Sequence, residues 1–230
     1  MKTIGMIGGM SWESTVSYYQ AINQGVKREL GGLHSGKIVL NSVDFAEIER
    51  LQHIGDWDKT ANILTKAALS LEAAGADFFL ICTNTMHKVA DEIAASVTIP
   101  LLHIADATGD QLVADGIKTV GLLGTQFTME QAFYKQRLTE QFAIEVMTPE
   151  PKERALIHSV IYEELCLGDI NANSRQAFLT TIDSLFERGA QAVILGCTEI
   201  ALLVGQEDTH IPLYDTTAIH AEAAVKKALY

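Results

Sequence analysis

Long apolar runs and clustered positive charge are both missing from this sequence of 230 residues. No stretch of about 18 or more uninterrupted apolar residues is present, so the sequence predicts no membrane-spanning segment. Lysine and arginine total 17 against 29 aspartate and glutamate residues, which gives a formal charge of −12. That charge has the wrong sign for binding a phosphate backbone, and no basic cluster offsets it. Neither a membrane nor a nucleic acid is therefore expected as a partner.

Cysteine is also scarce. The three cysteines are Cys82, Cys166 and Cys197, too few and too odd in number for a disulfide scaffold. None has the spacing of a zinc site, so no metal is predicted. The N-terminal apolar run is interrupted by glycines and lacks the small-residue cleavage pattern of a signal peptide. These features predict a cytoplasmic protein with reduced thiols.

An internal repeat organises what is present. The apolar run 189–196 ends in a cysteine and two polar residues, and the run 75–82, found 114 residues earlier, ends in three polar residues. Aligned without a gap, the two stretches place Thr83 over Cys197, Asn84 over Thr198, and Thr85 over Glu199. Each triplet follows a stretch that reads as a buried strand. The two halves of the chain therefore look like copies of one unit built around one site.

Two further echoes support duplication. The strand and turn at 4–11 recur 116 residues later, and the stretch 99–103 recurs 112 residues later as 211–215. Three echoes in the same order, with a drift of only two residues each, are hard to produce by chance. No linker rich in proline, serine or glycine separates the halves, so we expect them to pack tightly.

Short apolar strands alternate with longer helical patterns. We expect strands at 4–8, 37–43, 78–82, 99–103, 120–123, 192–196 and 211–215, and helices at 14–30, 58–74, 87–95 and 219–229. This alternation is typical of parallel βαβ units. The sequence predicts an α/β fold of two pseudo-symmetric parallel-sheet domains with the active site in the cleft between them. The expected first domain is 1–98 plus 208–230, and the second is 99–207.

Cys197 is the strongest candidate for a reactive group. It follows a buried strand and precedes an expected helix, whose N-terminus would lower the pKa of the thiol. A lone cysteine in such a place is more often a small buried residue. The polar residues beside it and in the matching triplet favour the reactive interpretation, because hydroxyls, an amide and free backbone N–H groups form a cradle for an α-carboxylate.

Three other features have simpler explanations. Gly8-Gly9 matches no phosphate-loop pattern and is expected to form a tight turn. His87 could be an acid or a base, but a histidine so placed more often orients a loop. Cys82 precedes Thr83, and neighbours on a strand point to opposite faces, so Cys82 should face the core.

The motifs together resemble a known family. Gly8-Gly9-Met10-Ser11, Asn84-Thr85-Met86-His87, Gly124-Thr125 and Gly196-Cys197-Thr198-Glu199, in this order over nearly the whole chain, are similar to the aspartate/glutamate racemases. The resemblance implies a cofactor-independent enzyme, commonly a homodimer. Two pseudo-symmetric domains would hold an amino acid between two cysteines, one removing the Cα proton and one returning a proton to the opposite face. The Cys-Thr-Glu ending looks more like the aspartate racemases than the glutamate racemases.

The sequence departs from the family pattern at two positions. Thr83 stands where two-cysteine members have their first cysteine, and Cys166 aligns where characterised aspartate racemases have a lysine for the distal carboxylate. A threonine hydroxyl is a far weaker base than a thiolate. Without this lysine, the sequence leaves two substrate classes open, namely acidic amino acids and a broad range of neutral amino acids. Arg50 could read an acidic side chain, although a solvated helix face explains Arg50 equally well.

The leading hypothesis is an amino-acid racemase that interconverts L- and D-enantiomers. Its catalytic pair would be Thr83 and Cys197, and its substrate-binding residues Met10, Gln52, Asn84, Thr85, Thr125, Cys166, Thr198 and Glu199. Single-cysteine relatives provide an alternative, namely a decarboxylase or a cis–trans isomerase of small dicarboxylates. A non-catalytic small-molecule binding protein is the third possibility.

Overall fold

The computed structural model describes all 230 residues and shows two compact units, each with its own parallel sheet. The first unit combines Met1–Ile104 with His220–Tyr230, and the second is Ala105–Ile219. The prediction of two parallel-sheet α/β units is confirmed. None of the helices combines the length and apolar character that crossing a bilayer requires.

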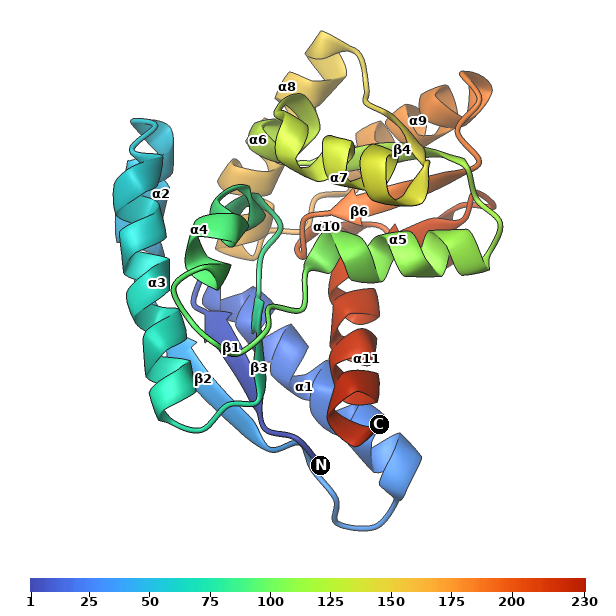
Figure 1. Cartoon of the computed structure of the whole chain (residues 1–230). Helices are drawn as coiled ribbons and strands as arrows, with labels where there is room; N and C mark the ends of the chain where they lie inside the picture. The colour runs from blue at the N-terminus through green and yellow to red at the C-terminus, as the bar shows by residue number, and fades with distance from the viewer. The chain divides into compact units, whose positions relative to one another are not determined.

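The first unit contains a three-stranded sheet of order β2-β1-β3 (Figure 1). Its strands are β1 (Ile4–Gly8), β2 (Ile38–Ser42) and β3 (Phe78–Ile81). Its helical elements are α1 (Trp12–Leu30), α2 (Phe45–His53), α3 (Trp57–Ala73), the 3₁₀ helix η1 (Thr85–Val89), α4 (Ala90–Ala94) and most of α11 (Thr216–Leu229). The expected strand at 99–103 is reduced to a single parallel bridge between Leu101 and Phe79.

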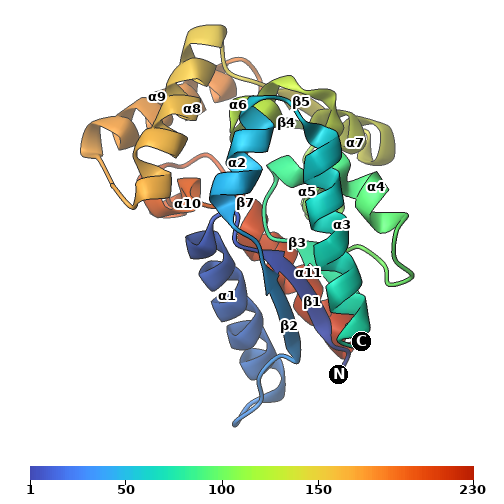
Figure 2. The same ribbon diagram turned by 90° about the vertical axis from the view of Figure 1, so that its left-hand side faces the viewer.

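Helices cover both faces of this sheet, and alternate strand residues serve the two faces. Ile4 and Met6 pack with side chains of α1 and α11, whereas Ile7 and Phe79 pack with side chains of α2, α3 and α4. Figure 2 shows α1 and α3 on opposite sides of β1 and β2. Strands β1 and β3 are therefore buried throughout, whereas the edge strand β2 is only partly buried. The polar triplet at 83–85 lies just past the buried strand β3.

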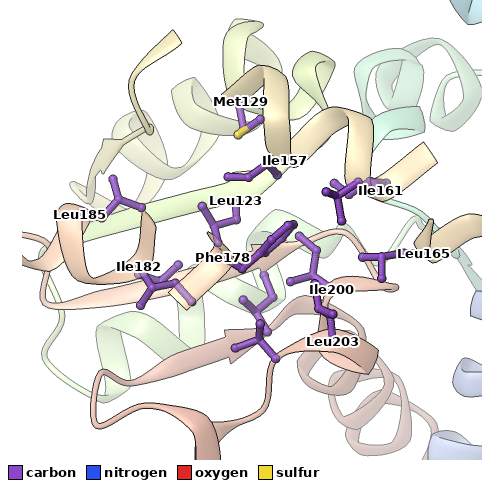
Figure 3. Close-up of a cluster of buried hydrophobic side chains, with 14 of the residues drawn as sticks. Leu123, Met129, Ile157, Ile161, Leu165, Phe178, Ile182, Leu185, Ile200 and Leu203 are labelled. Carbon is purple, nitrogen blue, oxygen red and sulfur yellow. The ribbon is translucent and has the colours of Figure 1, made fainter. Parts of the chain in front are cut away.

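The second unit has a four-stranded sheet of order β5-β4-β6-β7. Its strands are β4 (Thr119–Gly124), β5 (Glu145–Met147), β6 (Ala192–Gly196) and β7 (Leu213–Asp215). Its helical elements are α5 (Ile104–Ala114), α6 (Gln126–Glu130), α7 (Ala132–Phe142), α8 (Pro151–Glu163), η2 (Leu165–Leu167), α9 (Ala172–Glu187), α10 (Ile200–Leu203) and η3 (Gln206–Asp208). One face of the sheet packs on α8, α9 and α10 around Phe178, which is fully buried (Figure 3).

Strand pairing preserves the sequence repeat residue by residue. Ile4 pairs with Phe78 in the first unit, and their counterparts 116 and 114 residues later, Val120 and Ala192, pair in the second. The Phe79–Leu101 bridge likewise corresponds to the pairing of Val193 with Leu213, 114 and 112 residues later. Both units therefore share one strand order and one register, which supports duplication.

The chain passes between the units near the start of two corresponding helices, α5 and α11. The two passages lie at Ile104/Ala105 and Ile219/His220, later than the expected boundaries at 98/99 and 207/208. The difference arises because Leu101 still pairs with β3 of the first unit, and β7 pairs with β6 of the second. Each repeat therefore gives its last helix mainly to the unit built by the other repeat.

The Gly8-Gly9 turn after β1 requires both glycines. Gly9 has φ of 88°, and a Cβ placed on it would lie 2.2 Å from the backbone oxygen of Val43. A Cβ on Gly8 would lie 2.5 Å from Cγ2 of Thr15, whose hydroxyl accepts a hydrogen bond from the Gly9 N–H. The prediction of a tight turn with close backbone approach is confirmed.

We predict that Gly9→Ala lowers the free energy of unfolding by about 3 to 4 kcal/mol, because positive φ and a backbone clash both act on the new methyl group. Gly55→Ala is the matched control. Gly55 has φ of 72° with nothing within 4 Å of its would-be Cβ, so the cost there should be about 1 kcal/mol. Urea unfolding measures both variants. Equal losses would show that the Val43 contact contributes nothing.

Candidate active site

A buried carboxylate collects two hydrogen bonds directly after β6. The Cys197 thiol donates to Oε2 of Glu199 over 2.9 Å, and the Thr198 hydroxyl donates to the same oxygen over 2.6 Å. Glu199 is only 4% exposed, whereas Cys197 and Thr198 are partly exposed. The structure therefore presents a partly exposed cysteine whose thiol is hydrogen-bonded to a buried carboxylate.

This environment raises the pKa of the Cys197 thiol well above its ordinary value. Burial is the largest cause, followed by the negative charge of Glu199 and then by Cys166, while the Glu199 backbone N–H acts in the opposite direction. The prediction that this pKa is lowered is wrong, because burial of the thiol and the negative charge of Glu199 outweigh the backbone N–H that acts in the opposite direction. At neutral pH the proton stays on sulfur, with Glu199 positioned to accept it.

Two more predicted residues lie in the same unit. Thr125 directly follows β4, and Gly124 at the end of that strand pairs with Gly196 at the end of β6, so Thr125 and Cys197 continue from paired positions. The Thr125 hydroxyl caps α6 by accepting from the Thr128 N–H at 3.4 Å. Cys166 in η2 is partly exposed and packs on the same apolar cluster as Cys197.

Sequence reasoning missed an aromatic group beside Thr125. Nδ1 of His158 accepts the Gln126 N–H at 3.2 Å, and the His158 ring centroid lies 4.9 Å from that of Tyr162 and 6.4 Å from that of Phe127. Burial lowers the pKa of His158, and the bond from Gln126 requires an unprotonated Nδ1. The only sequence signal was the spacing of four residues between His158 and Tyr162 on one helix face.

In the first unit, Thr83 occupies the position corresponding to Cys197. Thr83 is partly exposed, and Asn84 and Thr85 beside it are buried. Nδ1 of His87 lies 2.8 Å from the Thr83 carbonyl oxygen, so His87 orients this loop. Cys82 is fully buried among apolar side chains of α1 and α11, and burial raises its pKa. The prediction that Cys82 faces the core is confirmed.

Met10 and Gln52 gather near the same loop. Both are 4% exposed. Met10 belongs to the apolar cluster that contains Met86, and Nε2 of Gln52 lies 4.0 Å from the Met86 sulfur. Met86 follows directly after Thr85. Arg50, on the same helix as Gln52, is exposed, which agrees with a solvated helix face.

The predicted site residues thus form two groups, one in each unit. The first unit contributes Met10, Gln52, Thr83, Asn84 and Thr85, and the second contributes Thr125, Cys166, Cys197, Thr198 and Glu199. No cluster of three or more histidine, cysteine, aspartate or glutamate residues is arranged to hold a metal ion. The first group offers a hydroxyl and an amide, and the second a thiol paired with a carboxylate. Such groups can transfer protons and bind a small anion.

Comparison with known proteins agrees with this chemistry. Residues 7–224 match the profile of the Asp/Glu/hydantoin racemase family. A proposed Asp/Glu racemase from Yersinia pestis is 57% identical, with a TM-score of 0.94 and 100% of each chain covered. An aspartate racemase homologue from Pyrococcus horikoshii OT3 is 32% identical, with a TM-score of 0.86 and 100% of each chain covered.

A curated relative has a broader described activity. RacX of Bacillus subtilis (strain 168), a broad specificity amino-acid racemase, is 26% identical over 177 residues, which cover 76% of this chain and 74% of RacX. The family match spans nearly the whole chain and includes both groups of predicted site residues. The chain therefore belongs to the Asp/Glu/hydantoin racemase family.

Proposed function

We propose that this protein interconverts L- and D-amino acids without a cofactor, with the two residue groups binding opposite faces of one substrate. The observation that carries the proposal is the Cys197 thiol hydrogen-bonded to the buried Glu199. A thiol whose proton has a ready acceptor can become the thiolate that removes a Cα proton. Membership of a racemase family supports the same reaction class.

The proton transfers can be written with residues of this chain. Glu199 accepts the Cys197 proton, and the thiolate then removes the Cα proton of the L-enantiomer. The electron pair left on Cα is delocalised into the α-carboxylate, which Asn84, Thr85 and the neighbouring hydroxyls would bind. The Thr83 hydroxyl gives a proton to the opposite face of Cα while it takes one from water, and the D-enantiomer forms. The Glu199 proton then neutralises the hydroxide left behind, so that the thiol, the carboxylate and the hydroxyl are all restored.

Thr83 makes the two proton-transfer steps of the proposed reaction unequal. A hydroxyl can give a proton to a carbanion, but its alkoxide is inaccessible at neutral pH, so it is a poor base. Cys82 cannot replace it, because Cys82 is buried in the apolar core. We therefore expect kcat to be higher from the L-enantiomer than from the D-enantiomer. KM should differ in proportion, because the two enantiomers are equal in free energy and kcat/KM must then be the same in both directions. Because Cys197 is the only thiol of the proposed catalytic pair, the alternative of a decarboxylase or a cis–trans isomerase is tested in the same experiment.

We predict that Cys197→Ser lowers Cα proton exchange by about 10²- to 10⁴-fold, because a hydroxyl cannot supply the thiolate. The measurement is NMR of a panel of L-amino acids incubated with the protein in deuterated water, with chiral analysis of the products. Deuterated D-product supports a racemase, whereas released CO₂ or an isomerised dicarboxylate supports the alternative. Cys82→Ala is the control and should retain exchange. Full exchange in Cys197→Ser would eliminate Cys197 as the base.

A second prediction concerns Glu199. Its negative charge disfavours the thiolate and raises the pKa of Cys197, so Glu199→Gln should lower that pKa toward the reference of about 8.5. Alkylation of Cys197 by iodoacetamide at pH 8 should become faster, because a larger fraction of the thiol is then ionised. Mass spectrometry across a pH series measures Cys197, with the Cys166 peptide as an internal comparison. An unchanged or slower alkylation of Cys197 would contradict this role of Glu199.

The third prediction concerns the substrate side chain. Cys166 packs on an apolar cluster and supplies no positive charge, and a carboxylate buried there without a partner would be costly. We expect kcat/KM for homoserine, methionine or leucine to equal or exceed that for aspartate and glutamate. Cys166→Lys should shift the preference toward aspartate by about tenfold, as a new ion pair would. A strong preference of the wild type for acidic substrates would point to another cation, with Arg50 the first to test.

A further inference from the structure

Three imidazole rings are buried behind the Thr83 loop. His87, His103 and His220 are 3%, 6% and 0% exposed. The His87 ring centroid lies 4.4 Å from that of His103 and 6.1 Å from that of His220. The rings come from η1, from the segment before α5 and from α11, all within the first unit. The reaction proposed above uses none of them.

Hydrogen bonds fix the protonation of His87. The Ile104 backbone N–H donates to Nε2 of His87 over 3.2 Å, so Nε2 carries no proton. Nδ1 lies 2.8 Å from the Thr83 carbonyl oxygen, which can only accept, so Nδ1 carries the proton and donates. His87 is thus a neutral imidazole with both nitrogens engaged, one on Ile104 and one on Thr83.

His220 fixes the segment from which Ile104 emerges. Nε2 of His220 lies 2.8 Å from the Leu102 carbonyl oxygen, and the Tyr18 hydroxyl lies 2.8 Å from Nδ1. The carbonyl can only accept, so the proton of His220 is on Nε2 and the Tyr18 hydroxyl donates to Nδ1. Residues 102–104 are therefore anchored to α1 and α11, and they in turn anchor His87.

We infer that His87 is a positioning residue for Thr83, an inference that rests on the proposed racemase function. Thr83 has a β-branched side chain with restricted χ1, so the direction of its hydroxyl follows its backbone. The bond from Nδ1 of His87 to the Thr83 carbonyl fixes that peptide plane. A proton donor misplaced by about 1 Å can cost a large factor in rate. His87 would thereby aim the hydroxyl that completes inversion.

The second unit has no histidine at the position equivalent to His87. The position corresponding to His87, 114 residues later, is Ala201, a residue of α10. There the reactive group is controlled through its side chain, by the bond from Cys197 to Glu199. Loss of the His87 bond should consequently affect the step at Thr83 and spare proton removal by Cys197.

The test separates these two steps. Wild type and variants are incubated in deuterated water with L-aspartate, L-glutamate, L-methionine or L-leucine, whichever the wild type inverts fastest, and two products are counted. Deuterated D-enantiomer reports inversion. Deuterated L-enantiomer reports exchange at Cys197 without inversion. The ratio of inversion to exchange is the readout, since general damage to the fold lowers both products together.

Two substitutions of His87 each keep one of its two hydrogen bonds and remove the other. His87→Asn keeps a donor at the Nδ1 position and should keep the wild-type ratio. His87→Gln can accept from Ile104 at the Nε2 position but loses the donor to Thr83, so its ratio should fall about tenfold. Tyr18→Phe is the control in the same buried cluster, and it should lower stability without changing the ratio.

Several results would overturn the inference. A wild-type ratio in His87→Gln, or an equal fall in both His87 variants, shows that His87 only fills space. The ¹⁵N chemical shifts of the His87 ring in the wild type show which nitrogen carries the proton, and they need neither turnover nor a variant. The inference requires the proton on Nδ1. A proton on Nε2 alone would leave no donor to the Thr83 carbonyl oxygen and would contradict it. Absence of inversion in the wild type with all four amino acids overturns the proposed function and this inference together. Inversion with an unchanged ratio in His87→Gln overturns the inference alone.

Discussion

Parallel pairing of the central strands determines where chemistry can occur in each unit. Every residue of β3 and of β6 is buried, because helices cover both faces of a parallel sheet. A polar side chain on either strand would lose its hydrating water and would therefore need a hydrogen-bond partner inside the apolar core. Partly exposed residues first appear past the strand ends, where Thr83 follows β3 and Cys197 and Thr198 follow β6. Thr83 and Cys197 stand at positions that the shared register makes equivalent.

Equivalent positions have acquired different chemistry in the two units. In the second, a thiol is held on a buried carboxylate, so that the raised pKa keeps the proton on sulfur until Glu199 accepts it. In the first, a hydroxyl needs no change of protonation to act as a donor, and its surroundings act on the backbone instead, through His87. A base needs an acceptor for its own proton, whereas a donor of high pKa needs mainly an accurate direction.

The repeat made much of this fold predictable, because echoes at fixed displacements also fix which residues pair. It did not reveal how far each strand extends. Pro100 lacks an N–H and can only accept, as its oxygen does from Phe79, and the stretch 99–103 forms one bridge rather than a strand. The site residues were named from motifs alone. The direction of the Cys197 pKa shift could not be predicted in this way, because it depends on the burial of the thiol and on its contact with Glu199.

The exchange of α5 and α11 was equally invisible, since sequence patterns show that a helix has an apolar face but not which sheet it covers. Ala221, Ala224, Val225 and Ala228 of α11 complete the core around Ile4 and Phe78 in the first unit. Gly25 of α1 permits this close packing, because a Cβ there would lie 2.8 Å from Val225.

The converse holds for α5. Its Asp106 forms an ion pair with Arg137, its Thr108 accepts from the Tyr134 hydroxyl, and its Gly109 packs against the ring of Phe142. Thr108 and His220 are counterparts 112 residues apart, and each meets the tyrosine of the unit it completes, Tyr134 or Tyr18. Neither repeat therefore supplies all the side chains that cover its own sheet. A unit of this kind acquires its full core only when both repeats have been synthesised, so the two strand ends that carry the chemistry are stabilised by one jointly folded chain.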